Sequence, residues 1–412
     1  MLKDAETHSN YLFASCYLRW DDYRLLLDEH KQYDCLHRLS EKDTFPLRKI
    51  NNGKIRIGFI SPDFRDHSVS YFIEPVIQYL PKNSFTVYCY SGVINADMIT
   101  KRIQSFCDEW RQLTGLDARQ CAETIYDDKI DVLVDLSGHT GGNFLPVFFY
   151  KPAPLQISYC GYPFSTGLSV MDYKVVDSTT DAPRVADIYY TEKLMRLDGC
   201  FLCYKPPPAP VITTRKGGGI VFGSFNSLPK LNSDVISLWA EILSVIPDSK
   251  IIIKRKSLDV PVVQRRIADM FMSFGVNPNR VIFIGHSPNL TTHLEWYNRI
   301  DVALDTFPYN GTTTTCEALY MGVPVVALCG DVHMSRVSTS ILNCIGCWEL
   351  IAENRSRYVE IAMGLSKNRD QIIAYKKTLR QRIFDGDLCD WAKFADKFGK
   401  KIMEVVDEKR KC

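Results

Sequence analysis

The sequence lacks several features that mark whole classes of protein. Its 50 basic and 48 acidic residues leave a formal charge of only +2, which gives no basis for binding nucleic acid or an anionic membrane. No apolar run reaches the ~18 residues that a membrane-spanning helix needs. The start, MLKDAETHSNYLF, also lacks the long apolar region of a secretory signal. We therefore expect a cytoplasmic protein with neither a nucleic-acid nor a membrane partner.

Two common nucleotide-binding motifs are also absent. The chain contains neither a GxGxxG dinucleotide fingerprint nor a GxxxxGK[ST] Walker A motif. Fourteen cysteines are many, but they are scattered, which is typical of small buried residues in a reducing compartment. Two CxxC pairs, Cys200–Cys203 and Cys344–Cys347, lack the glycine and polar turn residues of a zinc knuckle. We therefore expect no structural metal and no cofactor.

What the sequence does contain is an alternation of short apolar runs with longer polar stretches. KIRIGFIS, FTVYCYSG and IDVLVDLSGH are rich in β-branched residues, and helix-length stretches such as ADMITKRIQSFCDEWRQL lie between them. This alternation indicates βαβ units on a buried parallel sheet. It breaks at YKPPPAPVITTRKGGG, which is typical of a linker, and resumes with GIVFGSFN, SKIIIKRK, RVIFIGHS, IDVALDTF and VPVVALCG.

The pattern predicts two α/β domains of similar size with helical additions. The expected parts are a helical N-terminal segment 1–53, a first α/β domain 54–204, a linker 205–219, a second α/β domain 220–384 and a C-terminal amphipathic helix 385–412. Ligands of open α/β sheets bind outside the carboxyl ends of the strands. Two such domains facing each other would therefore form a cleft for a ligand.

Polar residues gather where strands of the first domain are expected to end. SPDFRDHSVSYF places His67 among charged residues directly after the first strand. An imidazole titrates near neutrality, so His67 is a candidate general base, although a histidine bonded within its own loop fits equally well. DLSGHTGGN presents His139 and Thr140 among glycines, which indicates close backbone approach to a ligand or simply a glycine-rich turn.

The second domain has its own polar turn after GIVF. GSFNSLPKLN places Asn226, Ser227 and Lys230 between a strand and a helix. A lysine in such a turn can reach a phosphate as a point charge, and the alternative is a solvated lysine. HSPNLTTHLEWYN adds His293, early in a helix.

The stretch NGTTTTCEALYMGVP places four threonines, Thr312 to Thr315, at the start of an apolar helix. One interpretation is an N-cap with redundant hydroxyls. The other is an anion site, where free amides, hydroxyls and the positive end of the helix dipole meet. Glu317, one turn later, is suited to accept hydrogen bonds from the hydroxyls of a ribose. Together with Lys230, this arrangement predicts a site for a nucleoside diphosphate.

Five stretches follow one another along the chain in the order of a known family. They are RIGFISPDFRDHSVSYF, DVLVDLSGHT, KPAPLQISYCGYPFSTGLSVMDY, GSFNSLPKLN and LDTFPYNGTTTTCEALYMGVP. From about Lys54 to its end, the chain resembles the catalytic region of the protein O-GlcNAc transferase and SPINDLY family of glycosyltransferases. The resemblance implies a GT-B fold, with two Rossmann-like domains and a C-terminal helix that crosses back. It also implies inverting, metal-independent transfer of a sugar from a nucleotide sugar to Ser or Thr of proteins.

The resemblance also implies roles for particular residues. Lys230 corresponds to the family's essential diphosphate-binding lysine, and His67 to a histidine proposed near the acceptor, so these two are the implied catalytic residues. The implied donor-binding set is Asn226, Ser227, Lys230, His293, Gly311, Thr312, Thr313, Thr314 and Glu317. The implied sugar and acceptor pocket is formed by His139, Thr140, Gly161 and Pro163.

The nature of the donor stays open between two nucleotide sugars. UDP-GlcNAc is the expected donor, with protein Ser or Thr as acceptor. The threonine run and TFPY look more like SPINDLY, whose plant members transfer fucose from GDP-fucose. Animal O-GlcNAc transferases differ here, with Asp in place of Glu317 and Gln in place of Ser227.

The choice of acceptor is open too. The family usually carries tetratricopeptide repeats that recruit protein substrates, whereas only the segment 1–53 precedes the first strand here. A GT-B transferase acting on a glycan or small molecule is therefore an alternative, and an inactive nucleotide-sugar-binding module is another. A metal-binding DxD pair, Asp385 and Asp387, lies away from the strand ends and is discounted.

Overall fold

The computed structural model describes residues 4–50, 52–215 and 217–411. The chain divides into two compact units: unit 1 comprises Met1–Lys205 and Asp390–Cys412, and unit 2 comprises Pro206–Cys389. The expected linker thus begins where unit 1 first ends. Residues 1–3 and 51 of the expected N-terminal segment, residue 216 of the linker and residue 412 of the last helix lie outside the description.

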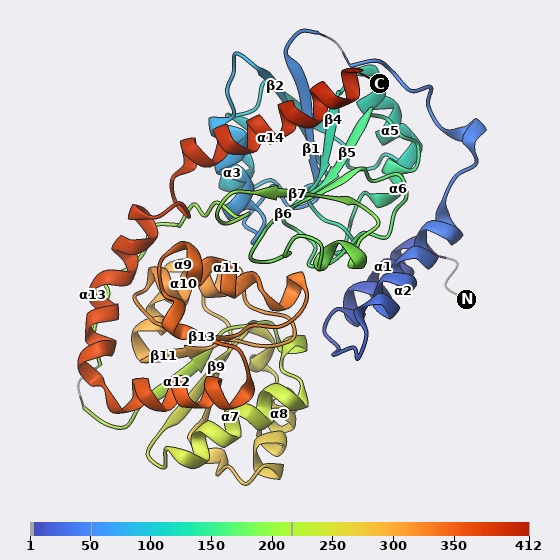
Figure 1. The fold of residues 1–412 in the computed structure, drawn as a ribbon. Coiled ribbons are helices and arrows are strands. Elements are labelled where there is room, and N and C mark those ends of the chain that lie inside the picture. The colour runs from blue at the N-terminus through green and yellow to red at the C-terminus, as the bar shows by residue number, and fades with distance from the viewer. Residues whose placement is uncertain (1–3, 51, 216, 412) are drawn as a thin grey trace. The chain divides into compact units, whose positions relative to one another are not determined.

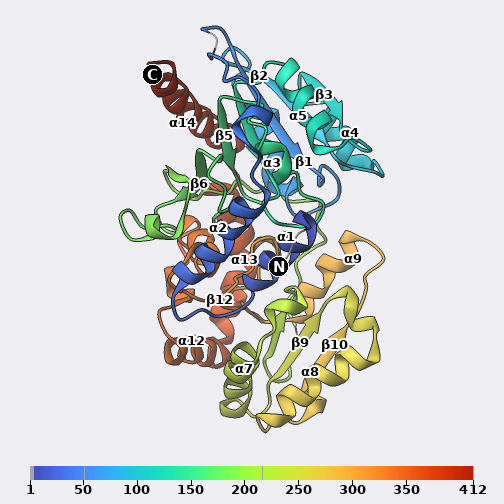
Figure 2. The same ribbon diagram turned by 90° about the vertical axis from the view of Figure 1, so that its right-hand side faces the viewer.

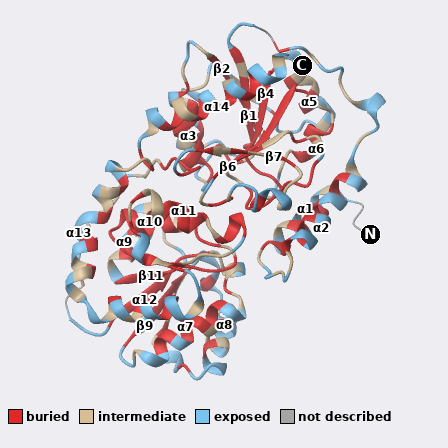
Figure 3. Cartoon of the chain, in the orientation of Figure 1, coloured by how far each residue is buried: buried red, intermediate tan, exposed pale blue. Residues whose placement is uncertain are grey.

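Unit 1 is built on a parallel sheet, with seven strands among the described residues in the order β3-β2-β1-β4-β5-β6-β7 (Figure 1). Figure 3 shows β1, β4 and β5 as buried, which accounts for their nearly continuous apolar sequences. The strands are β1 (Ile55–Ser61), β2 (Phe85–Ser91), β3 (Glu109–Gln112), β4 (Val132–Asp135), β5 (Leu155–Ser158), β6 (Tyr173–Asp177) and β7 (Lys193–Leu197).

The helices of unit 1 include the last helix of the chain. They are α1 (Ala5–Ser15), α2 (Tyr23–His37), α3 (Ser70–Tyr79), α4 (Met98–Gln104), α5 (Ala118–Asp127), α6 (Leu145–Phe148) and α14 (Trp391–Lys411), with short 3-10 turns at Glu41–Asp43 and Ala186–Tyr189. Helix α14 lies along α3 (Figure 1), and the indole Nε1 of Trp391 donates to the Tyr204 carbonyl at 2.9 Å. The C-terminal helix therefore crosses back to unit 1, as the resemblance implied.

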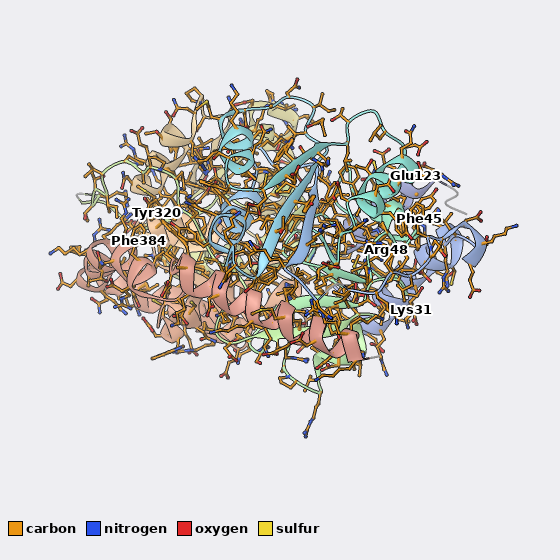
Figure 4. All side chains as sticks on the ribbon, turned by 90° about the horizontal axis from the view of Figure 1, so that it is seen from above. Lys31, Phe45, Arg48, Glu123, Tyr320 and Phe384 are labelled. Atoms are coloured by element: carbon orange, nitrogen blue, oxygen red, sulfur yellow. The ribbon has the colours of Figure 1, made fainter. Side chains whose placement is uncertain are left out.

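The N-terminal segment is only partly helical, which corrects the expectation of helix up to about residue 50. After the 3-10 turn the chain is extended, because Pro46 disfavours helix at the residue before it. Phe45 stacks on Tyr126 of α5 with ring centroids 4.7 Å apart, and the Arg48 guanidinium lies 4.9 Å from the same ring. Figure 4 labels Phe45 and Arg48. These aromatic contacts pack the extended segment against α5.

One stretch between strands was predicted wrongly. ADMITKRIQSFCDEWRQL was expected to be a helix, but α4 ends at Gln104 and β3 forms at 109–112. This strand pairs in parallel with β2, with Cys89 opposite Trp110. Tertiary pairing at the sheet edge therefore overrides the helical appearance of the segment.

Unit 2 repeats the design, with six strands among the described residues in the order β10-β9-β8-β11-β12-β13, all paired in parallel. The strands are β8 (Val221–Ser224), β9 (Lys250–Lys254), β10 (Val281–Ile284), β11 (Val302–Leu304), β12 (Val325–Leu328) and β13 (Ile351–Ala352). All five apolar runs expected to be strands in this half of the chain form strands.

The helices of unit 2 flank its sheet, and Figure 2 shows α7 and α8 next to β9 and β10. They are α7 (Ser233–Val245), α8 (Pro261–Ser273), α9 (Leu290–Glu295), α10 (Thr313–Tyr320), α11 (Val337–Cys344), α12 (Arg355–Lys367) and α13 (Arg369–Asp385). Because α13 continues to Asp385, the last helix begins at Trp391 and not at 385 as expected. None of the described helices is both long and apolar enough to cross a membrane.

Each sheet has a point where the strand order reverses. In unit 1 this point lies between β1 and β4, and in unit 2 between β8 and β11. Because all paired strands run in parallel, their carboxyl ends meet at one edge of each sheet. A ligand of an open α/β sheet binds at such an edge, outside the reversal point. The loops after β1, β4, β8 and β11 are therefore where each unit can form a site.

Candidate functional site

In unit 2 the loops after β8 and β11 are connected by buried side chains. The Asn226 amide Nδ2 donates to Asp305 Oδ1 at 3.2 Å, and the Thr314 hydroxyl donates to Asn226 Oδ1 at 3.0 Å. Asp305 Oδ1 also accepts from the Gly311 amide at 2.7 Å. A Cβ on Gly311 would lie only 2.6 Å from the Thr315 hydroxyl, so glycine is required there. This network positions the start of α10 against the end of β8.

Lys230 lies at the end of a short 3-10 turn, Leu228–Lys230, that follows β8. Its ammonium donates to the Asn310 carbonyl at 2.6 Å and lies 3.9 Å from the centre of the Tyr309 ring. Burial lowers the pKa of Lys230 to about 8, while the nearby Asp305 carboxylate acts in the opposite direction. An ammonium has three N–H donors, and among the described residues only the Asn310 carbonyl accepts from it. Lys230 therefore retains donors for a ligand.

The four threonines divide into two pairs. Thr314 bonds to Asn226, and the Thr315 hydroxyl lies 2.9 Å from the hydroxyl of Ser338, so both hold the protein together. Thr312 is the N-cap residue of α10 but makes no side-chain cap. Within the described residues, neither Thr312 nor Thr313 has a hydrogen-bond partner for its hydroxyl. The first interpretation, an N-cap with redundant hydroxyls, is therefore not what forms, and the helix start remains open to an acceptor.

The far end of α10 is anchored to α13. The Arg380 guanidinium donates to the Tyr320 carbonyl at 2.8 Å and lies 4.7 Å from the Tyr320 ring. Phe384 meets the same ring edge-on, with centroids 6.0 Å apart, and Figure 4 labels both aromatic side chains. These contacts fix the carboxyl end of α10 and thereby hold in position its amino end, which has no side-chain cap.

Glu317 is nearly buried, with 6% of its surface exposed, and one of its two oxygens is already in use. Oε2 lies 3.0 Å from His293 Nε2 and accepts from the Tyr297 hydroxyl at 3.0 Å. Oε1 has no hydrogen-bond partner in the part of the chain that the structure describes. The expected ribose contact is thus restricted to Oε1, since Oε2 is held inside the protein.

Three residues of this region were not predicted from the sequence: Lys254, Tyr297 and Asp305. Lys254 and Asp305 end or directly follow the strands β9 and β11. Charged residues at the carboxyl ends of the runs SKIIIK and VALD were a usable signal, because the carboxyl ends of parallel strands lie at one edge of the sheet. Tyr297 had no such signal, since it lies in the 3-10 turn Trp296–Arg299 after α9, and its contact with Glu317 depends on how that turn packs.

Ser227 and His293, two other residues predicted to bind the nucleotide sugar, form hydrogen bonds within the protein. The Ser227 carbonyl accepts from the Lys230 amide at 3.0 Å and so closes the turn that carries the lysine. Ser227 makes no side-chain cap on that turn. His293 has a partner at each ring nitrogen, because Lys254 Nζ lies 2.8 Å from Nδ1 and Glu317 lies at Nε2. The structure therefore brings the predicted donor-binding residues together within unit 2.

In unit 1, His67 lies in the loop between β1 and α3. Its Nδ1 accepts from the Val69 amide at 3.3 Å, and Asp63 Oδ2 lies 3.6 Å from the same nitrogen. Burial lowers the pKa of His67, and the Asp63 carboxylate acts against that shift. A neutral imidazole suits a general base, but Nε2 accepts a proton only when Nδ1 carries one, with its N–H toward Asp63. The role of His67 as a base stays a prediction.

His139 lies inside unit 1 with no exposed surface. Its Nε2 donates to the Thr166 carbonyl at 2.8 Å, and its Nδ1 lies 3.0 Å from the Ser9 hydroxyl of α1. Burial and the nearby His30 keep the pKa of His139 well below its ordinary value. With both nitrogens in use, His139 supports the loop after β4, and its contact with a sugar stays a prediction.

The remaining predicted pocket residues lie beside His139. The Thr140 hydroxyl donates to the Ser137 carbonyl at 2.8 Å. A Cβ on Gly161 would lie 1.8 Å from the Leu136 carbonyl oxygen, so this glycine is required by the close approach of two backbone segments. Pro163 is buried in the next turn. These residues shape the end of the sheet in unit 1, and the sugar pocket itself is a prediction that the structure does not test.

Among the described residues, no group of three or more His, Cys, Asp or Glu side chains is arranged to hold a metal ion. The two CxxC pairs lie in different units, Cys200 and Cys203 in unit 1 and Cys344 and Cys347 in unit 2. Asp385 accepts from Gln381 at the exposed end of α13.

Comparison with known proteins identifies relatives over most of the chain. The model of a family described as Glycosyl transferase family 41 matches residues 21–206 and 204–398. The Petunia hybrida protein named "Probable UDP-N-acetylglucosamine--peptide N-acetylglucosaminyltransferase SPINDLY" is 36% identical over 403 residues, which are 93% of this chain and 42% of that protein. The Arabidopsis thaliana protein of the same name is 38% identical over 379 residues, or 89% of this chain and 40% of that protein.

Solved structures give the same picture of the fold. A mutant of the Thermobaculum terrenum O-GlcNAc transferase is 32% identical with a TM-score of 0.93, covering 99% of this chain and 78% of that one. A glycosyltransferase from Rickettsia africae, 11% identical with a TM-score of 0.53, covers 87% of this chain and 99% of that one and is similar in fold alone. The α/β, GT-B fold class is thereby confirmed. The cleft between the domains stays a prediction.

The chain spans less than half the length of the curated relatives it matches. Their names include UDP-N-acetylglucosamine and a peptide acceptor, and none of them includes GDP-fucose. The alternative donor of the sequence analysis therefore receives no support from these relatives.

Proposed function

Since the chain belongs to glycosyl transferase family 41, we propose that it transfers N-acetylglucosamine from UDP-N-acetylglucosamine to Ser or Thr hydroxyls of a protein. The transfer is inverting and needs no metal ion. Unit 2 binds the donor, with its diphosphate at the start of α10 and its ribose at Glu317. The matching of the family model to nearly the whole chain, 21–398, supports this reading over an unrelated nucleotide-binding protein.

The observation that carries the proposal is the open start of α10 beside a partly buried lysine. Lys230 donates to the carbonyl of Asn310, two residues before the N-cap residue Thr312. The ammonium, the uncapped amides and two hydroxyls without partners among the described residues therefore converge on one place. Partial burial lowers the pKa of Lys230 although the Asp305 carboxylate is near, so a further anion stabilises the ammonium, and a diphosphate supplies two negative charges.

The chemistry assigned to this site is a displacement at the anomeric carbon. The acceptor hydroxyl oxygen forms a bond to that carbon from the face opposite the leaving group, while the bond to the diphosphate oxygen breaks. The electron pair leaves with UDP, and the hydroxyl proton passes to a base, for which His67 is the candidate. Lys230 and the α10 amides stabilise the charge that grows on the leaving oxygen, so they act most strongly in the transition state.

Metal independence has a direct test. If Lys230 and the helix start neutralise the diphosphate, we expect transfer to continue in excess EDTA. Loss of transfer on chelation, with recovery on adding Mn²⁺, would show that an ion performs this neutralisation instead.

The function itself is tested by mass spectrometry of acceptor proteins. The chain is expressed with candidate acceptors and supplied with UDP-N-acetylglucosamine or GDP-fucose in separate reactions. We expect N-acetylhexosamine on Ser or Thr with the first donor and no modification with the second. Fucose transfer would overturn the donor assignment, transfer to a glycan or small molecule alone would overturn the acceptor, and donor binding without any transfer would indicate an inactive binding module.

A further inference from the structure

Lys254 is a buried cation for which the transfer reaction described above assigns no role. It is the last residue of β9, at the carboxyl edge of the unit 2 sheet, and only 4% of its surface is exposed. Its ammonium lies 2.8 Å from His293 Nδ1 and 6.0 Å from the centre of the Phe225 ring. Burial lowers the pKa of Lys254, and the charge of Glu317 acts in the opposite direction. Burial of an ammonium is unfavourable unless the group is hydrogen-bonded, so the contacts of Lys254 require an explanation.

The chain of contacts from Lys254 runs through His293 to Glu317. An ammonium has only N–H donors, so a hydrogen bond to Nδ1 requires the lone pair of that nitrogen to be free. The ring proton must then be on Nε2, where it donates to Glu317 Oε2, 3.0 Å away. The Tyr297 hydroxyl donates to the same oxygen at 3.0 Å. Two donors thus fix Oε2, and the carboxylate turns Oε1 to the side where the described residues leave it without a partner.

We propose that Lys254 is a positioning residue, which holds His293 as the Nε2–H tautomer and thereby aims Glu317 Oε1 at the ribose of the donor. The inference rests on the proposed function, because it assigns the ribose contact to Glu317. It adds a residue that acts through two others and touches no ligand itself. Without Lys254, His293 is free to carry its proton on Nδ1, and Nε2 then faces Glu317 Oε2 as two acceptors with no proton between them.

The proposal makes a prediction for the unliganded protein that does not depend on activity. In protein labelled with ¹⁵N in histidine, the His293 ring is expected to give the nitrogen shifts of an Nε2–H tautomer, assigned by the signal that is lost in His293→Asn. Lys254→Met retains a long apolar side chain but removes the donor, and we expect its spectrum to show a mixture of tautomers. An Nδ1–H tautomer in the unsubstituted protein would overturn the proposal, whether or not any variant folds.

The second test separates nucleoside from phosphate binding. Calorimetry with UDP and with inorganic pyrophosphate is compared for the unsubstituted protein, Lys254→Met and the control Lys250→Met, an exposed lysine at the other end of the same strand. We expect Lys254→Met to weaken UDP binding about fivefold to tenfold, on the scale of one hydrogen bond. Pyrophosphate binding should stay unchanged, because it involves Lys230 and α10 alone.

The outcomes distinguish this inference from the function on which it rests. Equal weakening of UDP and pyrophosphate would mean that Lys254 binds phosphate directly, and unchanged UDP binding would mean that it positions nothing; either result overturns the proposal. Absence of UDP binding in the unsubstituted protein would instead overturn the donor site as a whole. Far-ultraviolet circular dichroism confirms that each variant is folded before it is compared.

Discussion

The two units have the same type of sheet and the same reversal of strand order, yet their polar residues at that point are used differently. In unit 1, buried Asp135 accepts from the amides of Ser137 and Gly138 at 3.1 and 2.8 Å, and His139 has a partner at both nitrogens. In unit 2, Lys230 has spare donors and α10 starts without a side-chain cap. Asp135 and His139 at the reversal point in unit 1 are thus bonded within the protein, although the buried Ser137 hydroxyl has no partner among the described residues, whereas the cation and the helix start in unit 2 are left for a ligand.

The two sheets share one topology, which determines where these polar residues lie but not whether they bond within the protein or are left for a ligand. Burial raises the pKa of Asp135 to about 6, and two backbone amides act against this rise. The corresponding network in unit 2 includes a cation, and burial lowers the pKa of Lys230 to about 8. Charged and polar groups that are bonded within the protein stabilise a loop, while a cation with spare donors favours binding of the anion that fills them. The following predictions test this contrast.

The largest effect is expected from removing the Lys230 ammonium. Lys230→Met should lower the rate of sugar transfer by about 10²-fold or more, because the charge of the leaving diphosphate loses its stabilising ammonium. UDP binding should fall less, since the missing interaction is strongest in the transition state. Steady-state kinetics and calorimetry measure the two effects, with Lys250→Met as the matched control. Near-normal transfer by a folded variant would show that unit 2 does not use Lys230.

The next largest effect is expected in unit 1, at Gly161. Gly161→Ala should reduce the free energy of unfolding by about 1–3 kcal/mol, because its Cβ would meet the Leu136 carbonyl oxygen at 1.8 Å. Pyrophosphate binding in unit 2 should not change. Gly141→Ala is the control, since no atom lies within 4 Å of its Cβ position. Denaturant unfolding followed by circular dichroism measures the loss, and equal stability of the two variants would contradict the close approach.

A smaller effect is expected at the ribose contact. Glu317→Gln can keep an oxygen at the Oε2 position, where His293 and Tyr297 donate, but it then places an NH₂ group where Oε1 was. We expect UDP affinity to fall about tenfold, from the loss of a charge-assisted hydrogen bond. Pyrophosphate affinity should be unaffected. Calorimetry with both ligands checks the result, and unchanged UDP binding would place Glu317 outside the site.

The smallest effect is a pH dependence. Because the pKa of Lys230 is lowered to about 8, its ammonium form prevails below that value and is lost above it. From pH 7 to pH 9 the charged fraction falls from about nine-tenths to about one-tenth, so UDP affinity should weaken by up to about tenfold. Binding an anion raises this pKa, so the complex takes up protons in that range. Calorimetry in buffers of different ionisation enthalpy measures the uptake, and Lys230→Met should abolish it apart from any part that Lys254 contributes.

The lowered pKa of Lys230 also determines the direction in which the free energy of unfolding changes with pH. The unfolded chain binds the Lys230 proton more tightly than the folded protein between pH values of about 8 and 10.5. Stability therefore rises with pH across that window, and below pH 8 the partly buried ammonium carries its full cost. We accordingly expect Lys230→Met to be at least as resistant to thermal unfolding at pH 7 as the unsubstituted protein.

Much of the candidate site could be predicted because strand ends are visible in the sequence. The runs before Asn226 and Gly311 are apolar and β-branched, and the polar residues that follow them had to lie at the carboxyl edge of a parallel sheet. The threonine run was recognised as a helix start, and the structure places α10 there. Strand β3 was missed, because EWRQ at a sheet edge is polar and lacks the signal that buried strands carry.

The sequence by itself determined the order of the elements, the polar turns at the strand ends and the family to which the chain belongs. Only the tertiary structure decided which polar groups are satisfied. Ser9 of α1 reaches His139, and Lys254 of β9 reaches His293, across 130 and 39 residues of sequence. Hydrogen bonds between distant segments depend on packing that no local pattern encodes. For this reason His139 and Glu317, both singled out from their motifs alone, differ in the structure: the first has a partner at each of its ring nitrogens, and the second keeps one oxygen for a ligand.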